Sequence, residues 1–198
     1  MQLIFATNNN HKLQEISHLL GDSFTLRSLS EMGINEDIPE DYMTLEENAL
    51  FKARYIYNLT GADTFADDTG LEIESLNGQP GVHSARFAGE DKDFSANIDK
   101  VLMLLGDNEN RKACFRTVIA LILNDREYLF EGRIDGHITK ERRGSSGFGY
   151  DPVFVPLGSD RTFAEIDLAE KNKVSHRALA FNKLKAFLSD SGYNKEAV

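Results

Sequence analysis

The chain has little cysteine and little proline: one cysteine and four prolines among 198 residues. The single cysteine, Cys114, excludes an intrachain disulfide framework and is typical of proteins in a reducing cytoplasm, where we expect this chain. Because Cys114 lies in an apolar run, we expect a small buried side chain there and not a nucleophile. The sequence also lacks a Pro/Ser-rich linker, an internal repeat and a low-complexity tract, so we expect one domain over residues 1–198.

Long apolar runs and excess positive charge are absent as well. No run approaches the ~20 apolar residues that a membrane-spanning helix needs. The first residues lack the basic segment and cleavage site of a signal peptide, so we expect none. The net charge of −10 repels nucleic-acid backbones and anionic membranes, and we expect neither as a partner. A small phosphorylated substrate is compatible, because a local cationic pocket or a metal ion overrides the global field.

Hydrophobic residues make up 41% of the chain, and their spacing predicts strands mixed with helices. We expect strands over residues 3–6, 24–29, 64–66, 71–76, 113–123 and 127–135. We expect helices over residues 12–20, 45–59 and 95–105, and a last helix that Ser175 caps and that extends to Leu188. Thr44 and Glu47 have the spacing of a capping box, and glycines are expected to end the first three helices, at Gly21, Gly61 and Gly106. This order of elements predicts an α/β fold with a mixed β-sheet.

A polar turn joins the first strand to the first helix and consists of Thr7, Asn8, Asn9, Asn10, His11 and Lys12. Free backbone amides at a helix N-terminus bind anions, and Lys12 adds a positive charge. The turn lacks the glycines and the Lys-Ser/Thr pair of a P-loop. It is either an anion-binding loop or an ordinary loop in which asparagines adopt turn conformations.

Two adjacent carboxylates, Asp67 and Asp68, follow the third predicted strand and precede Thr69 and Gly70. Such a pair is costly to bury unless a positive charge compensates it. Mg²⁺ prefers hard oxygen ligands, typically one or two carboxylates together with substrate phosphates. Because adjacent residues of an extended chain point to opposite faces, we expect one aspartate to face the site and the other to support the loop. A solvated acidic turn is the alternative interpretation.

A glycine-rich loop over residues 144–149 leads into Tyr150, Asp151 and Pro152. Glycines allow a ligand to approach the backbone closely. Phe148 and Tyr150 offer flat faces for base stacking, worth ~1–3 kcal/mol per base where it has been measured. Asp151 can accept hydrogen bonds from a base edge. The alternative is a tight loop whose aromatic side chains fill the core.

Positive charges gather at the predicted start of the last helix, where Lys171, His176 and Arg177 lie near Ser175. The helix dipole disfavours cations at this end, so the cluster repels itself unless an anion binds there. Such local conflicts tend to mark functional sites, and we interpret this one as an anion site. The alternative is a surface helix on which Glu170 offsets part of the charge.

Together, these segments resemble the inosine/xanthosine triphosphate pyrophosphatase family, also called HAM1-like or non-canonical purine NTP pyrophosphatases, from about residue 3 to about residue 188. The joint order and spacing of the pieces make the match specific. The pieces are Thr7-x-Asn9-x-x-Lys12, Glu47-Asn48-Ala49 with Lys52-Ala53-Arg54, Ala66-Asp67-Asp68-Thr69-Gly70-Leu71, Pro80-Gly81 with Ser84-Ala85-Arg86-Phe87-Ala88-Gly89, Gly147-Phe148-Gly149-Tyr150-Asp151-Pro152, and Glu170-Lys171 with Ser175-His176-Arg177. Asn8 and His83 depart from the family pattern, which often has Gly and Tyr there.

The resemblance implies Mg²⁺-dependent hydrolysis of non-canonical purine nucleoside triphosphates (XTP, dITP and ITP) to the monophosphate and pyrophosphate, which removes them before incorporation into DNA or RNA. It implies that Asp68 is the catalytic residue and a metal ligand, with Glu40, or Asp41 beside it, as the second acidic position. It implies a substrate-binding set of Thr7, Asn8, Asn9, Asn10, His11, Lys12, Thr69, Phe148, Gly149, Tyr150, Asp151, Lys171, His176 and Arg177. The first residues of this set grip the phosphates, and those from Phe148 onward form the nucleobase and sugar pocket.

The resemblance also implies an elongated mixed β-sheet flanked by helices, with two lobes around a central cleft, and a homodimer. Two other hypotheses compete with it. A Maf-like pyrophosphatase shares the chemistry but is expected to lack the Ser175-His176-Arg177 segment. A nucleotide-sensing module binds nucleotide without releasing pyrophosphate, and the intact Asp67, Asp68 and Lys12 argue against it.

Overall fold

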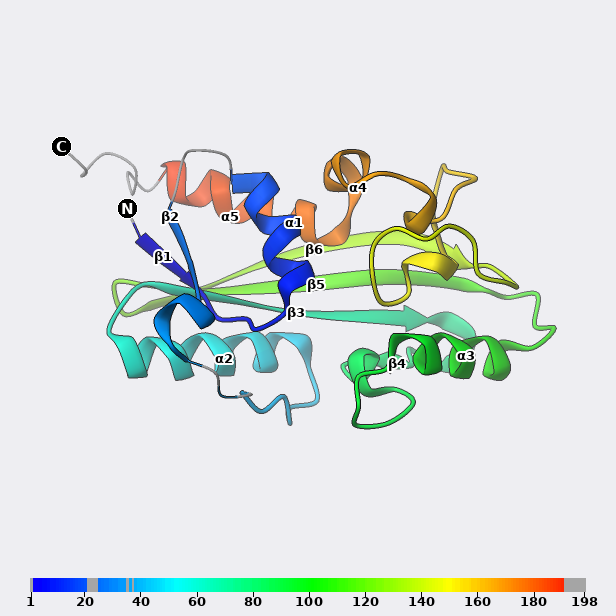
Figure 1. Cartoon of the computed structure of the whole chain (residues 1–198), viewed down its shortest axis with the longest axis horizontal. Helices are drawn as coiled ribbons and strands as arrows, with labels where there is room; N and C mark the ends of the chain where they lie inside the picture. Colours follow the sequence, from blue (N-terminus) through cyan, green and yellow to red (C-terminus); the bar gives the residue numbers. More distant parts are fainter. Residues whose placement is uncertain (1, 21–24, 35, 37, 191–198) are drawn as a thin grey trace. The chain divides into compact units, whose positions relative to one another are not determined.

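The computed structural model describes residues 2–20, 25–34, 36 and 38–190, which form an α/β fold (Figure 1). The strands are β1 (Gln2–Phe5), β2 (Thr25–Ser28), β3 (Thr64–Ile73), β4 (Pro80–Gly81), β5 (Lys112–Leu123), β6 (Arg126–Ile138) and β7 (Phe154–Pro156). The α-helices are α1 (Asn10–Leu20), α2 (Leu45–Thr60), α3 (Phe94–Leu105), α4 (Leu168–Val174) and α5 (His176–Asp190). None of these helices is long and apolar enough to span a membrane, within the residues just given.

The strands form one seven-stranded sheet in the order β2-β1-β3-β5-β6-β7, with β4 paired to β3. β1 is parallel to β2 and β3, whereas the β3–β4 and β6–β7 pairs are antiparallel. β5 turns into β6 through Asn124 and Asp125, whose φ angles of 49° and 61° lie in the left-handed region that these two residue types tolerate. The predicted hairpin, the α/β class and the mixed sheet are confirmed.

The chain divides into two compact units. Unit 1 contains residues 1–68, 117–132 and 177–198, and unit 2 contains residues 69–116 and 133–176. β3, β5 and β6 each contribute residues to both units. The two units agree with the two lobes that the family resemblance implies, and the cleft stays a prediction.

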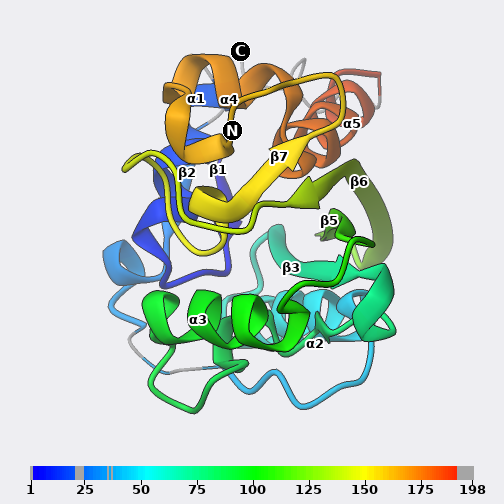
Figure 2. The ribbon, with the colours of Figure 1, turned by 90° about the vertical axis from the view of Figure 1, so that its right-hand side faces the viewer.

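In unit 1, α1 and α5 lie on one side of the strands and α2 lies on the other (Figure 1 and Figure 2). The side with α1 and α5 holds the hydrophobic core, in which Phe5 stacks on Phe65 at a centroid distance of 4.5 Å. The buried core residues are Leu3, Phe5, Ile16, Phe65, Ile119, Leu121, Leu123, Ala180, Phe181, Leu184 and Leu188. α2 buries the stripe expected of an amphipathic helix, but this stripe includes two polar residues, Asn48 and Lys52.

Unit 2 has an aromatic core built on β5. The ring of Phe115 lies 4.7 Å from that of Phe154 and 6.3 Å from that of Phe163, measured between centroids. From α3, the same cluster receives Ile98, Val101 and Leu105. This packing fixes the loop that follows β6 and the segment that leads into α4.

β3 is a single strand of ten residues, whereas the sequence predicted two strands, 64–66 and 71–76, around an acidic turn. The strand continues through the two aspartates because neighbouring lysines compensate their charges. It continues through Gly70 because this residue has no side chain: a Cβ there would lie 2.7 Å from the carbonyl oxygen of Gly81. The alternative of a solvated acidic turn is therefore excluded.

The first helix begins at Asn10, two residues before the prediction, and α4 was not predicted. α4 starts after Asp167, whose side chain accepts a hydrogen bond from the N–H of Glu170 at 2.7 Å. With seven residues it is too short for hydrophobic periodicity to reveal. Two residues of the predicted elements, Gly21 and Phe24, lie outside the described residues.

The cap of α2 gives a first test of the fold. Oγ1 of Thr44 accepts from the N–H of Glu47 at 3.2 Å and donates to the Glu47 carboxylate at 2.8 Å. We expect Thr44→Ala to lower the free energy of unfolding by ~1 kcal/mol, as measured by urea denaturation. Thr44→Ser keeps the hydroxyl, so its free energy of unfolding should be close to that of the wild type. Equal stability of Thr44→Ala and the wild type would show that the cap does not stabilise the protein.

Candidate active site

Asn9 caps the first helix of unit 1. Its Oδ1 accepts hydrogen bonds from the N–H groups of His11 at 3.0 Å and Lys12 at 3.2 Å. Its own N–H donates to Oγ1 of Thr7 at 3.2 Å. Two of the helix amides are thus bonded within the turn, and the expectation that the turn binds an anion stays a prediction. The exposed polar side chains of the turn are those of Asn8, Asn10 and His11.

Lys12 reaches from α1 to β3, where its Nζ lies 3.0 Å from Oδ1 of Asp67. Oδ2 of the same carboxylate lies 3.3 Å from Nε of Arg177 on α5. Burial raises the pKa of Asp67, but the charges of Lys12, Arg177 and Lys52 outweigh burial and hold that pKa well below its ordinary value. Asp67 is therefore a buried anion shared by cations from two helices.

Arg177 lies at the start of α5 and is fully buried. One of its Nη groups contacts the carboxylate of Glu15 on α1, while Nε contacts Asp67. The guanidinium lies between two carboxylates of unit 1, and the expected contact of Arg177 with the nucleobase or sugar stays a prediction. Glu15 was missed, because nothing in the sequence around it distinguishes it from a surface carboxylate.

Lys52 on α2 contacts Asp68 from the other side of β3. Its Nζ contacts Oε1 of Glu40, lies 3.5 Å from Oδ1 of Asp68, and donates to the main-chain oxygen of Asp67 at 2.8 Å. Burial lowers the pKa of Lys52, but the charges of Asp68, Glu40 and Asp67 raise it above its ordinary value. The two aspartates thus face opposite sides of the strand, as expected for adjacent residues. We call these residues of unit 1 the β3 charge cluster: Lys12, Glu15, Glu40, Lys52, Asp67, Asp68 and Arg177.

Asn48 positions the loop that carries Glu40. Its Oδ1 accepts from the N–H of Tyr42 at 3.0 Å, and its Nδ2 donates to the Tyr42 carbonyl at 3.2 Å. Of the two acidic residues that the sequence left open, Glu40 reaches Lys52, whereas Asp41 is exposed. Lys52 and Asn48 were not predicted as site residues, although their polar side chains on a buried helical stripe were the available signal.

Asp68 has one carboxylate oxygen that the protein leaves without a hydrogen bond. Oδ2 is buried and has no hydrogen-bond partner among the described residues. Burial raises the pKa of Asp68; Lys52 opposes this shift and Glu40 reinforces it, and the net shift is upward. The β3 charge cluster holds four carboxylates and three cations, so one further positive charge would balance it.

The side-chain oxygen atoms of the β3 charge cluster determine which metal ion could bind there. The part of the chain that the structure describes has no group of three or more His, Cys, Asp or Glu side chains that could hold a metal. Asp68 and Glu40, joined through Lys52, are two carboxylates with hard oxygen donors. This number is what Mg²⁺ uses when substrate phosphates complete its shell. The residues therefore fit Mg²⁺ that binds together with a polyphosphate.

Unit 2 brings together three residues of the predicted base pocket. Nζ of Lys171 lies 2.5 Å from Oδ2 of Asp151 and 5.0 Å from the ring centroid of Phe148. The same carboxylate oxygen accepts from the N–H of Phe148 at 2.9 Å. Gly147 is required beside it, because a Cβ there would lie 2.0 Å from Oδ2 of Asp151. We call Phe148, Asp151 and Lys171 the Lys171 cluster.

Two further residues of the predicted pocket belong to the core of unit 2. Tyr150 is buried, its hydroxyl donates to the carbonyl of Ser84 at 2.9 Å, and burial raises its pKa. The ring of His176 is buried and stacks on Phe115 at 4.5 Å. The expectation that Tyr150 offers a stacking face is therefore corrected. Gly149 and Thr69 are half-buried, the latter within β3.

The positive charges around Ser175 are divided between two helices. Lys171 and Lys173 lie in the last turn of α4, where the helix dipole favours cations. Only His176 and Arg177 begin the following helix. The conflict with the dipole that the sequence suggested is thus smaller than expected, and an anion is not needed to explain Lys171.

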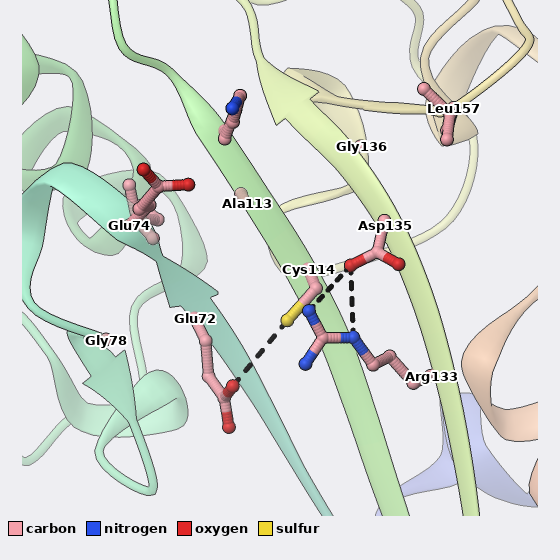
Figure 3. A pocket seen from close by; sticks show the side chains of 11 residues that line it. Glu72, Glu74, Gly78, Ala113, Cys114, Arg133, Asp135, Gly136 and Leu157 are labelled. Carbon is pink, nitrogen blue, oxygen red and sulfur yellow. Dashed lines mark hydrogen bonds and ion pairs between the residues drawn. The ribbon is translucent and has the colours of Figure 1, made fainter.

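Unit 2 also has a pocket of about 460 Å³ on β3, β5 and β6, outside the predicted site (Figure 3). Its charged side chains contact one another: Arg133 lies 2.7 Å from Asp135. The sulfur of Cys114 lies 3.6 Å from the Glu72 carboxylate. Burial raises the pKa of Cys114 to about 11, so the thiol is not ionised at neutral pH, in agreement with the expected absence of a nucleophile.

Comparison with known proteins gives a family match over almost the whole chain. The model of the Ham1 family matches residues 3–187. A dITP/XTP pyrophosphatase of Porphyromonas gingivalis is 54% identical over 188 residues, which cover 94% of this chain and 97% of that protein. A dITP/XTP pyrophosphatase of Flavobacterium psychrophilum is 50% identical over 190 residues, which cover 96% of this chain and 100% of that protein.

Solved structures agree with the fold. The Ham1 protein of Staphylococcus aureus superimposes with a TM-score of 0.87 at 37% identity, covering 96% of this chain and 100% of the other. A HAM1 protein of Coxiella burnetii has a TM-score of 0.88 at 39% identity, covering 96% and 99%. The resemblance inferred from the sequence motifs is therefore confirmed.

The lowered pKa of Asp67 predicts how the free energy of unfolding changes at acidic pH. A carboxylate whose pKa is lower in the folded than in the unfolded protein stabilises the fold above the unfolded value of ~4. This stabilisation is lost as the pH falls below ~4 toward the folded pKa, because only the unfolded chain binds the proton there. We expect the stability of Asp67→Asn to fall less steeply below pH ~4 than that of the wild type, in urea denaturation at several pH values. Parallel pH profiles of the two proteins would contradict the assignment of Asp67 as a compensated anion.

Proposed function

The chain belongs to the Ham1 family, and on this premise we propose that it hydrolyses non-canonical purine nucleoside triphosphates such as dITP, XTP and ITP to the monophosphate and pyrophosphate. This reaction removes these nucleotides from the pool before they enter DNA or RNA. The observation that carries the proposal is the pairing of Asp68 and Glu40 on the single buried lysine Lys52. Two carboxylates exceed the charge of the one lysine that they share, and such incompletely compensated buried carboxylates tend to occur at functional sites.

The β3 charge cluster is assigned to the triphosphate. Mg²⁺, held by Asp68 and Glu40, would neutralise phosphate charge and polarise the leaving group. Asp68 orients the attacking water and accepts its proton, since its Oδ2 has no hydrogen-bond partner among the described residues and can accept one from the water. Lys12, at the end of the polar turn, offers its ammonium to the phosphate chain, and Thr7 and Asn9 shape the turn.

The Lys171 cluster is assigned to the nucleobase. Hypoxanthine and xanthine carry a 6-oxo group that accepts a hydrogen bond, whereas adenine carries a 6-amino group that donates one. The ammonium of Lys171, fixed by Asp151, is a donor that adenine cannot satisfy. Such an unmatched buried donor gives strong discrimination between bases. Phe148 supplies a half-buried ring next to this donor.

We also propose a homodimer located in the cytoplasm. The family resemblance supports the dimer, and the single unreactive cysteine supports a reducing compartment. Light scattering coupled to gel filtration measures the molecular mass, and therefore the oligomeric state, directly. A mass of one chain, 22.2 kDa, would contradict the dimer.

The catalytic assignment is tested by Asp68→Asn, which preserves the size of the side chain and removes its charge and its capacity as a base. We expect kcat for pyrophosphate release from dITP to fall at least ~100-fold, with the far-ultraviolet circular dichroism unchanged. Asp41→Asn is the matched control, since Asp41 is an exposed carboxylate next to Glu40, and it should keep wild-type activity.

The substrate assignment is tested with the wild-type protein. Pyrophosphate release should require Mg²⁺ and should be faster with dITP, XTP and ITP than with dATP or dGTP. Tight binding of dITP without pyrophosphate release would favour the nucleotide-sensing module. Preference for pyrimidine triphosphates would favour the Maf-like alternative.

A further inference from the structure

Four charged side chains of unit 1 form a chain of three ion pairs. Lys12 and Glu15 lie three residues apart on α1, so they project from the same side of that helix. Lys12 contacts Asp67, Asp67 contacts Arg177, and Arg177 contacts Glu15. Charges alternate along this chain of ion pairs, which joins the first turns of α1 to β3 and α5.

This chain of ion pairs is buried except at Lys12. The side chains of Glu15, Asp67 and Arg177 are 4%, 1% and 2% exposed, whereas that of Lys12 is 14% exposed. Lys12 thus has the most exposed side chain of the four, and it is the one placed to meet a ligand. Glu15 lies at the far end of the chain of contacts, separated from Lys12 by two charged groups.

Asp67 divides its two oxygens between Lys12 on one side and Arg177 on the other. Arg177 in turn divides its guanidinium between Asp67 and Glu15. If Glu15 loses its charge, Arg177 interacts more strongly with Asp67 and draws that carboxylate toward itself. Lys12 then loses part of the interaction that holds its ammonium in place.

We propose that Glu15 is a positioning residue for the phosphate-binding lysine, acting through Arg177 and Asp67 to fix the ammonium of Lys12. This inference rests on the proposed function, because it takes the bound anion to be the triphosphate of the substrate. Glu15 acts through Arg177 on Asp67, whereas Lys52 contacts Asp68 from the opposite side of β3. Its effect therefore falls on the binding of phosphate and not on the chemical step.

The test is Glu15→Gln, which keeps the shape of the side chain and removes its charge. We expect KM for dITP to rise about tenfold while kcat stays within about threefold. The inhibition constant of inorganic tripolyphosphate should rise by a similar factor, whereas that of inosine, which carries no phosphate, should not change. Glu15→Asp retains the charge on a shorter side chain, so its KM for dITP should lie between those of the wild type and Glu15→Gln.

Glu127→Gln is the matched control, because it also removes a carboxylate from an arginine pair of unit 1, the exposed pair with Arg54. It should leave all of these constants unchanged. The proposal would be overturned if only kcat changed, or if inosine and tripolyphosphate lost binding affinity equally. Either result would mean that Glu15 has a general structural role.

A second measurement does not depend on turnover. Amine-reactive labelling followed by peptide mass spectrometry gives the acylation rate of Lys12 relative to the exposed Lys140. We expect Glu15→Gln to raise this relative rate severalfold, because the ammonium is held less firmly, and an unchanged rate would overturn the proposal. Absence of pyrophosphate release by the wild type would instead refute the proposed function, while the labelling would still decide whether Glu15 holds Lys12.

Discussion

Two adjacent carboxylates in the middle of a buried strand are the constraint on which the rest of unit 1 depends. An uncompensated buried charge costs several kcal/mol or more, which is comparable with the ~5–15 kcal/mol that stabilise a whole domain. Because strand residues alternate, Asp67 and Asp68 need cations from opposite sides of β3. Lys12 on α1 and Lys52 on α2 supply them, and Arg177 on α5 adds a third. These ion pairs add to the hydrophobic packing that holds α1 and α5 against the strands.

The same arrangement makes the two aspartates chemically different. Asp67 has two cations of its own, and their charges hold its pKa well below the ordinary value. Asp68 shares one lysine with Glu40, and its second oxygen has no hydrogen bond from the described residues. Incomplete compensation at a buried carboxylate is costly for folding, so it is expected where a ligand brings the missing charge. The Lys171 cluster of unit 2, by contrast, is already neutral and offers fixed donors.

Local patterns in the sequence predicted the features that depend on neighbours along the chain, such as the strand, turn and helix that place Lys12. The residue pattern of the family also pointed to Asp68. Features that depend on distant contacts were missed: Arg177 meets Glu15 across 162 residues of sequence, and no local signal marks that pair. Tyr150 shows a different limit, because an aromatic residue in a glycine-rich loop suits both a core and a base-stacking site. Only the tertiary packing decides between the two.

On β3, cations compensate the charge of Asp67, whereas Asp68 shares its one lysine with Glu40 and is expected to bind a further cation. Carboxyl ¹³C titration by NMR, followed at Asp67 and Asp68 with and without Mg²⁺ and inorganic tripolyphosphate, measures this directly. The account predicts a pKa below the usual ~3.9 for Asp67 and above it for Asp68, with the metal and polyphosphate lowering only the pKa of Asp68. Equal pKa values for the two residues, or a response confined to Asp67, would contradict it.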